Sequence, residues 1–366
     1  MSVSMSVLYF RDVNGTYKPK MFFDEAGTVD IQRYDVVKYP MVKRLTENQL
    51  ANYWRPTEVN MSQDKIDYND FTEAEKHVFS SNLKRQIILD SVQGRAPALC
   101  FLPIVSDSWA EAFINAWNFY EGIHSSSYTH IIENVYANAS EIYDTMKEIR
   151  EIAECSDEIS KYYNELLRCI KEYEYADFRT KKAFYLCMVA VNALEQIRFH
   201  VSFACTFSFA NRGKMKGAGE IVTLIRQDEA FHCGFTQFVL RQSPKEDPDM
   251  AKIAEECQAE VEAILYAVYY QELEWIEYLF SKGPIVGLTK QELIVYLQYH
   301  VGKCMRRNGV EPNFHVPVKE PIPWMRKFLN EAGDEDQPAP QEETILQYQT
   351  GQVDMNVVES ELDTDF

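Results

Sequence analysis

Apolar residues recur three and four positions apart through most of residues 31–327, and this spacing predicts amphipathic helices. The same stretch is rich in strong helix formers and contains few turn dipeptides. The long candidate helices cover approximately residues 34–54, 72–102, 108–136, 180–209, 216–240 and 247–280.

Helix-breaking residues fall between these segments, at Arg95-Ala96-Pro97, Asn211-Arg212-Gly213, Ser243-Pro244 and Gly283-Pro284. The chain has no repeat of solenoid period and no glycine-rich phosphate loop, which disfavours nucleotide-binding folds. We therefore expect one all-α domain, a helical bundle, over residues 31–330. Residues 1–30 are expected to form an N-terminal extension.

Residues 331–366 differ from the predicted bundle in composition. They contain eleven acids, and no Lys or Arg follows Lys327. Low hydrophobicity with dense negative charge predicts a flexible, disordered tail. A tail that only improves solubility would not need apolar residues, yet this one contains Ile345, Leu346, Tyr348, Val357, Val358, Leu362 and Phe366. These residues favour a segment that folds on a partner protein, with Leu362 and Phe366 as anchors.

The charge balance and the cysteines limit the cellular setting. The net charge of −19, from 37 basic and 56 acidic residues, disfavours binding to nucleic acid. No apolar run approaches the roughly 18 residues that a membrane helix needs, and the first residues lack the layout of a secretion signal. Eight scattered cysteines without a C-x-x-C pair indicate reduced thiols. We expect a cytoplasmic protein without nucleic-acid or membrane partners.

Two Glu-x-x-His motifs indicate metal chemistry. Glu121 precedes His124 and Glu229 precedes His232 by three residues, in both cases inside a predicted helix. Positions three apart are neighbours on one helix face, so each carboxylate and imidazole can bind the same ion. A single pair would be weak evidence, since Glu and His also meet on solvated surfaces. Two pairs flanked by apolar residues are stronger.

Two further carboxylates interrupt apolar runs. Asp90 follows IIL and Glu195 follows VAVNAL, so both acids are expected inside the bundle. A buried acid can instead pair with an arginine or the backbone. A dimetal site in a four-helix bundle, however, needs one carboxylate from each of two helices besides two Glu-x-x-His pairs. The predicted ligand set is Asp90, Glu121, His124, Glu195, Glu229 and His232.

This ligand set favours two iron ions, with manganese as the other choice. Four carboxylates and two imidazoles suit iron or manganese, whereas zinc prefers more histidine or cysteine. Two divalent cations also neutralise four carboxylates, which suits a buried site.

Tyr128 is expected to face the metals. It lies seven residues after Glu121, so on a helix it returns to within about 20° of the same face. A tyrosine at such a position is by default a packing residue. Here Phe199, Phe203 and Ile225 are predicted on the metal-facing side as well. They would form the dry, unreactive pocket that a tyrosyl radical requires.

Four segments together resemble the ribonucleotide reductase small subunits of class I. They are LDSVQGRAP (89–97), YEGIHSSSYTHI (120–131), NALEQIRFHVSFAC (192–205) and RQDEAFH (226–232). The resemblance covers roughly residues 20–330 and the tail, in order and spacing. It implies a ferritin-like fold and a homodimer that acts beside a separate large, nucleotide-binding subunit. It also implies that O2 oxidises a carboxylate-bridged metal pair while Tyr128 becomes a radical.

The same resemblance assigns a transfer route. Trp54 and Asp228 would relay an electron and a proton through His124, and Tyr348 would pass the radical to the large subunit. Without the resemblance, Trp54 is a core aromatic and Asp228 orients a histidine ligand. Three positions depart from better-known bacterial members, where other residues are common: Ser126, His200 and Gln227.

Two other functions are compatible with the predicted bundle. A di-iron oxidase or monooxygenase uses the same ligands without a stable radical, and fold alone does not exclude it. An iron-storage protein is the weaker alternative. Neither needs Tyr128, the Trp54–Asp228 pair or a tail with a lone tyrosine, so the sequence favours the reductase subunit.

Overall fold

A computed structural model describes residues 19–25 and 31–329 of the chain. These residues contain α-helices and isolated β-bridges but no named strand, so the predicted all-α helical bundle is confirmed. The α-helices are α1 (Pro40–Ala51), α2 (Asp64–Asp70), α3 (Glu73–Gln93), α4 (Ala96–Phe101), α5 (Ser108–Val135), α6 (Ser140–Thr145), α7 (Arg150–Glu172), α8 (Phe178–Ala193), α9 (Phe199–Asn211), α10 (Lys216–Glu246), α11 (Pro248–Glu256), α12 (Gln258–Leu279), α13 (Lys290–Arg307) and α14 (Arg326–Leu329).

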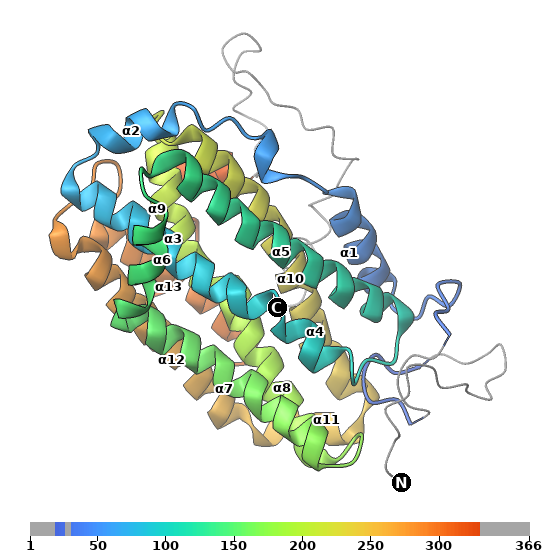
Figure 1. Cartoon of the computed structure of the whole chain (residues 1–366). Coiled ribbons are helices and arrows are strands. Elements are labelled where there is room, and N and C mark those ends of the chain that lie inside the picture. Colours follow the sequence, from blue (N-terminus) through green and yellow to red (C-terminus); the bar gives the residue numbers. More distant parts are fainter. Residues whose placement is uncertain (1–18, 26–30, 330–366) are drawn as a thin grey trace.

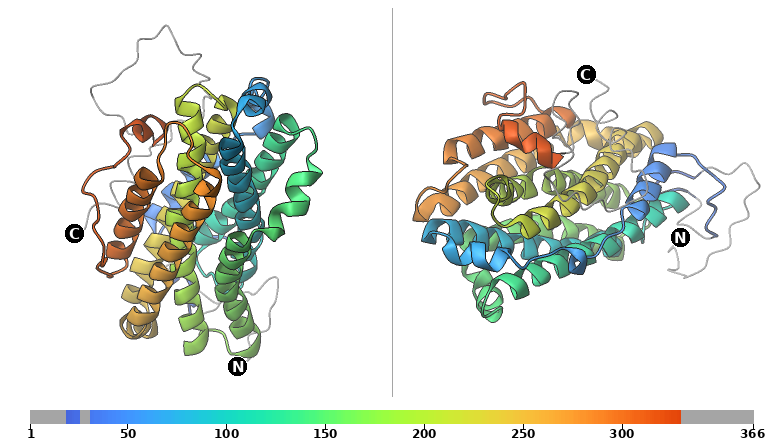
Figure 2. Two further views of the ribbon diagram at one scale, coloured as in Figure 1. Left: turned by 90° about the vertical axis from the view of Figure 1, so that its left-hand side faces the viewer. Right: turned by 90° about the horizontal axis from the view of Figure 1, so that it is seen from above.

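The long helices run side by side in one elongated bundle (Figure 1). Seen from above, α8, α9 and α10 lie between α3 and α5 on one side and α12 and α13 on the other (Figure 2). Helix α7 packs against α8, α3 and α12. The central helices are therefore covered by other helices, and one continuous apolar core fills the bundle. None of the helices in the described residues combines the length and apolarity of a membrane span.

Several predicted helices differ from the observed ones at their ends. The predicted helix 72–102 is two helices, because the chain turns at Gly94 and Arg95 before α4 begins at Ala96, with Pro97 in its first turn. The predicted helix 34–54 is shorter, since Pro40 occupies the first turn of α1, a position that proline favours. The predicted helix 247–280 is divided at Cys257 into α11 and α12.

One expected break is wrong. Pro244 lies inside α10, which continues to Glu246. A proline removes one backbone N–H and disturbs the carbonyl four residues earlier, which is costly in the middle of a helix. Only two residues of α10 follow Pro244, so the disturbance is confined to the last turn of the helix.

Two long helices were not predicted, α7 and α13. The sequence of α7 does contain a helical pattern. Its buried residues are spaced three or four positions apart, at Ile152, Cys155, Ile159, Tyr163 and Leu166. This face of α7 packs onto the bundle, and one of its residues reaches the candidate site described below.

The start of α10 is held by acids from α2. Asp64 accepts hydrogen bonds from the backbone N–H groups of Gly217 (3.1 Å) and Ala218 (2.7 Å). Gly217 has no room for a side chain, since a Cβ atom there would lie 2.5 Å from the Met61 sulfur. Together these contacts fix the register of α10 against α2. Residues in the middle of α10 contribute to the candidate site.

The remaining regions stay predictions. The N-terminal extension falls mostly, and the acidic tail wholly, outside the described residues. Tyr348, Leu362 and Phe366 therefore lie outside them as well.

Candidate metal centre

Four elements of the bundle contribute the six predicted ligands. Asp90 lies on α3, Glu121 and His124 lie on α5, and Glu229 and His232 lie on α10. Glu195 lies on a single turn of π-helix, Leu194–Arg198, between α8 and α9. Such turns are rare and occur frequently at functional sites. All six residues are at most 2% exposed.

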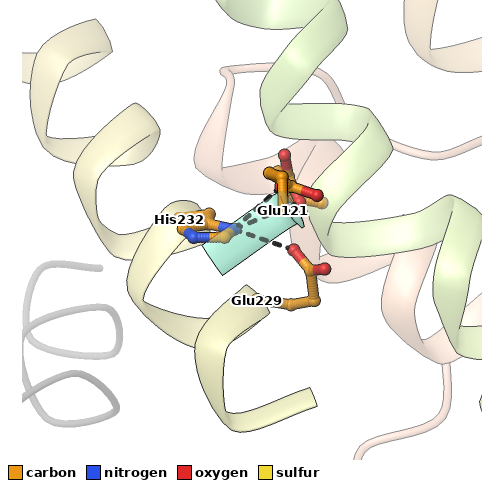
Figure 3. A group of neighbouring side chains, drawn as sticks. Glu121, Glu229 and His232 are labelled. Carbon is orange, nitrogen blue, oxygen red and sulfur yellow. Dashed lines mark hydrogen bonds and ion pairs between the residues drawn. The ribbon is translucent and has the colours of Figure 1, made fainter. Parts of the chain in front are cut away.

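The side chains of both Glu-x-x-His pairs converge in the core. His232 Nδ1 lies 3.0 Å from Glu229 Oε2 and 3.4 Å from Glu121 Oε1. Figure 3 shows the Glu121 and Glu229 carboxylates turned toward the His232 ring. His124 Nδ1 lies 3.2 Å from Glu229 Oε1 and 3.5 Å from Glu121 Oε2. Each of the two glutamates therefore lies between the two imidazoles.

The six residues form two overlapping groups that share one carboxylate. In each group, one ligand atom per residue lies within 4.8 Å of all the others. The first group is Asp90, Glu121 and His124, and the second is Glu121, Glu195, Glu229 and His232. Two ions that share the Glu121 carboxylate fit this arrangement.

The unpartnered atoms of the cluster also fit cations. Both carboxylate oxygens of Asp90, Oε2 of Glu121 and Glu195, Oε1 of Glu229 and Nδ1 of His124 are buried without a hydrogen-bond partner. Buried oxygen and nitrogen atoms of this kind are costly unless something binds them. Divalent cations would satisfy all of them at once, with the hard oxygen donors that iron and manganese accept.

Burial and mutual repulsion change the protonation of the cluster. Burial, and next the charge of a neighbouring glutamate, raise the pKa of Asp90 and of Glu195 well above their ordinary values. Burial also acts on Glu229, but interactions with Glu195, His124 and His232 outweigh it and hold its pKa well below the usual range. Without cations, the cluster therefore keeps protons that bound metal ions would replace.

This charge arrangement predicts a pH-dependent stability of the metal-free protein. Asp90 and Glu195 keep protons when folded at pH values where they are ionised when unfolded, so stability falls as pH rises above their ordinary pKa values of 3.8 and 4.5. His124, whose pKa is raised by Asp228 and two glutamates against the effect of burial, adds to this loss above 6.5. Glu229 has a lowered pKa, so it has the opposite effect: stability falls as pH decreases, but only below its ordinary pKa of 4.5.

We therefore expect the thermal midpoint of metal-free protein to fall between about pH 6 and pH 8, and saturating Mn2+ to restore it. Differential scanning calorimetry with and without the ion measures both effects. The Glu195→Gln variant, which lacks one of these protons, serves as the control and should show a shallower fall. Equal midpoints at both pH values without metal would contradict the prediction.

The outer nitrogen atoms of both histidines are also held. His124 Nε2 lies 3.1 Å from Asp228 Oδ2, which accepts a 2.9 Å hydrogen bond from Trp54 Nε1. Asn52 donates to the other Asp228 oxygen at 2.9 Å. Such partners fix the ring orientation of histidine ligands and leave the other nitrogen for the metal. His232 Nε2 lies 2.8 Å from the side-chain amide of Gln49, which plays the corresponding part.

Two carboxylates are held in the same way by residues that the sequence reasoning missed. Trp117 Nε1 donates to Glu121 Oε1 at 2.9 Å, and the Gln93 amide donates to Glu195 Oε1. Trp117 precedes Glu121 by four residues and Gln93 follows Asp90 by three, so helical spacing alone would have placed them on the ligand faces. Asn52 and Gln49 carried no such signal, because they approach from α1 and the residues after it.

Tyr128 is fully buried on α5, and its hydroxyl has no hydrogen-bond partner. Burial, and after it the Asp90 carboxylate, raise the pKa of this phenol well above its usual value. Phe199, Phe203 and Ile225 are at most 1% exposed, and the two phenylalanine rings stack with their centroids 5.6 Å apart. That these three residues line a pocket around Tyr128 stays a prediction.

Local contacts account for two of the three positions that differ from better-known bacterial family members. The ring of His200 lies 4.1 Å from that of His300, and burial together with nearby positive groups lowers its pKa well below the usual value. His200 is therefore neutral. Ser126 donates to the carbonyl of Ile123 at 2.8 Å, a bond within its own helix. Nothing in the structure explains Gln227.

A helical bundle with buried carboxylates and histidines converging from four of its elements belongs to the ferritin-like class of carboxylate metalloproteins. Comparison with known proteins narrows the class. The family model described as ribonucleotide reductase, small chain, matches residues 33–321. The ribonucleoside-diphosphate reductase subunit beta of Haemophilus influenzae is 40% identical over 97% of this chain and 98% of its own length. Ribonucleoside-diphosphate reductase 1 subunit beta of Escherichia coli O157:H7 is 41% identical, over 96% of each chain.

Solved structures agree in fold. The ribonucleotide reductase R2 subunit from Clostridium botulinum superposes with a TM-score of 0.71 at 23% identity, over 88% of this chain and 98% of that one. Dimanganese(II)-NrdF from Streptococcus sanguinis superposes with a TM-score of 0.67 at 19% identity, over 88% and 100%. The chain belongs to the ribonucleotide reductase small-chain family. It is a subunit of a ribonucleoside-diphosphate reductase, an enzyme that also needs a large subunit.

Proposed function

We propose that this small subunit uses O2 and a pair of metal ions to generate a radical on Tyr128. The large subunit then uses this radical to reduce ribonucleotides to deoxyribonucleotides for DNA synthesis. One observation carries the proposal: an unpartnered, fully buried phenol lies beside the carboxylate of Asp90, at the edge of the cluster. A phenol in that place can lose a hydrogen atom without meeting water.

Asp90, Glu121, His124, Glu195, Glu229 and His232 would hold the ions. We propose iron, with manganese as the alternative, since both accept this mixture of oxygen and nitrogen donors. When bound, the two ions would supply the reduction of O2 and the oxidising power for Tyr128. The protein keeps the six donors dry and oriented, while Phe199, Phe203 and Ile225 exclude solvent from the phenol.

Transfer out of the site is proposed to pass through Trp54 and Asp228. One Asp228 oxygen contacts both His124 Nε2 and Trp54 Nε1, at 3.1 and 2.9 Å, so a continuous hydrogen-bonded path leads from a candidate ligand to an indole. Asp228 can hold the proton between the two rings. Trp54 is fully buried, but the preceding residue, Tyr53, is 48% exposed. The path therefore approaches the protein surface. Tyr348 would carry the radical onward from the tail.

The assembly is proposed from the sequence. Leu362 and Phe366 would dock the acidic tail on the large subunit, and two copies of this chain would form a homodimer. We place the protein in the cytoplasm, which agrees with eight free cysteines, all buried.

An oxidase or monooxygenase and an iron-storage protein were the alternatives. The match over nearly the whole length of reductase subunits favours the reductase, and the Trp54–Asp228 pair has no use in storage.

Aerobic reconstitution tests the proposal directly. Metal-free protein would be loaded with Fe2+ or Mn2+ in air, followed by metal counting and electron paramagnetic resonance. We expect two ions per chain and a tyrosyl signal with at least one of the metals. Two ions and O2 consumption without any tyrosyl signal would instead support an oxidase.

A further inference from the structure

Helix α7 carries none of the six candidate ligands, yet one of its residues reaches them. The Tyr163 hydroxyl donates a 2.8 Å hydrogen bond to Gln93 Oε1. The Gln93 amide nitrogen in turn donates to Glu195 Oε1. All three side chains are at most 2% exposed, so the chain of two hydrogen bonds lies wholly in the core.

The order of donors in this chain matters. An amide has a donor end and an acceptor end, and only its nitrogen can donate to a carboxylate. Donation by Tyr163 occupies the oxygen of Gln93 and so keeps the nitrogen turned toward Glu195. If the amide rotated, its oxygen would face a carboxylate oxygen, and two acceptors would repel each other.

The hydrogen bond from Gln93 also selects which oxygen of Glu195 is free. Oε1 is held by the amide, whereas Oε2 has no partner and lies 3.9 Å from His232 Nδ1. Glu195 lies on the π-turn, whose hydrogen bonds differ from those of the flanking helices. A side-chain contact from α3 therefore helps to fix the carboxylate that this turn presents.

Tyr163 is suited to act as a fixed hydrogen-bond donor and not to exchange protons. Burial, and next the neighbouring thiols of Cys187 and Cys100, raise the pKa of its phenol well above the usual value, so the hydroxyl keeps its proton. Its ring packs 6.1 Å from that of Phe101, and the Cys100 thiol donates to its backbone carbonyl at 3.7 Å. The surroundings thus hold the phenol in place.

We propose that Tyr163 is a positioning residue of the metal centre: through Gln93 it holds Glu195 so that Oε2 faces the ion bound with Glu121, Glu229 and His232. This inference rests on the proposed metal site. It assigns α7 a part in tuning one of the two ions, because the side-chain hydrogen bonds of Tyr163 and Gln93 lead to Glu195 and not to Asp90 or His124.

The test measures Mn2+ binding to metal-free protein, with free Mn2+ followed by electron paramagnetic resonance. In Tyr163→Phe we expect one of the two ions to bind about 10- to 100-fold more weakly, the usual effect of losing a partner of a ligand. The other ion should keep its affinity. Gln93→Met, which removes the amide that links Tyr163 to Glu195, should weaken binding of the same ion.

A double variant separates positioning from general destabilisation. Because Tyr163 acts through Gln93, adding Tyr163→Phe to Gln93→Met should cause no further loss of affinity. Tyr136→Phe is the matched control, since Tyr136 directly follows α5 and its hydroxyl is hydrogen-bonded to Ser80 at 2.7 Å, away from the cluster. It should leave both affinities unchanged.

Additive losses in the double variant, or unchanged binding in Tyr163→Phe, would overturn the positioning role. Failure of the proposed metal site would be seen separately, because the unmodified protein would then not bind two ions.

Discussion

Replacing Tyr128 by phenylalanine is expected to abolish the tyrosyl radical and deoxynucleotide formation, while two metal ions still bind. The substitution removes only the hydroxyl, which makes no hydrogen bond, so the packing of the core should barely change. Asp90, the candidate ligand whose carboxylate acts most on the Tyr128 phenol, keeps both carboxylate oxygens for a cation. The loss should therefore appear in turnover and not in folding or metal content.

Three measurements on Tyr128→Phe distinguish these effects: metal counting after aerobic loading, electron paramagnetic resonance, and nucleotide reduction with the large subunit. Tyr185→Phe is a suitable control, because Tyr185 is a buried tyrosine on α8 that is not among the candidate ligands or their partners. If Tyr128→Phe kept turnover, Tyr128 would be an ordinary core residue, and the radical would have to form elsewhere.

Deleting residues 359–366 is expected to abolish stable binding to the large subunit while leaving metal content and the Tyr128 radical intact. The deleted segment contains Leu362 and Phe366, the apolar residues proposed as anchors. A short apolar segment can dock in a groove of a partner, and the acidic chain before it would act as a tether. Radical formation needs only the bundle, so it should not depend on these residues.

Because the anchors and Tyr348 are different parts of the tail, we also expect docking and radical transfer to be separable. Tyr348→Phe should bind the large subunit as the unmodified protein does, yet fail to support turnover, because Tyr348 acts in transfer and the anchors in binding. Neutralising two tether acids with Glu342→Gln and Glu343→Gln is the control and should alter neither. Pull-down with the large subunit and turnover assays measure both properties. Unchanged affinity after the deletion would mean that the tail only improves solubility.

The candidate ligands were identifiable from the sequence because their signals are local. Helical geometry fixes which residues share a face, so two Glu-x-x-His pairs and acids within apolar runs indicate a buried cluster before any packing is known. The structure brings these six side chains together, and their role as ligands stays a proposal. The acidic tail was likewise visible as a change of composition after Lys327.

The partners of the ligands were decided by tertiary structure. Gln93 and Glu195 are 102 positions apart, and Gln49 and His232 are 183 apart. Contacts over such separations depend on how helices cross and in which register they pack, which local periodicity does not encode. For the same reason the reach of α7 into the site through Tyr163 was not predicted, although its apolar spacing was present.

The sequence by itself determined the helical class, the candidate ligands and the composition of the tail, because each follows from residue type and spacing within a single segment. Only the tertiary structure decided which carboxylate oxygens are tied and which are free, and that Glu195 is presented by a π-turn. Those properties arise where separate helices meet, and there the packing of several elements sets the position of each polar atom.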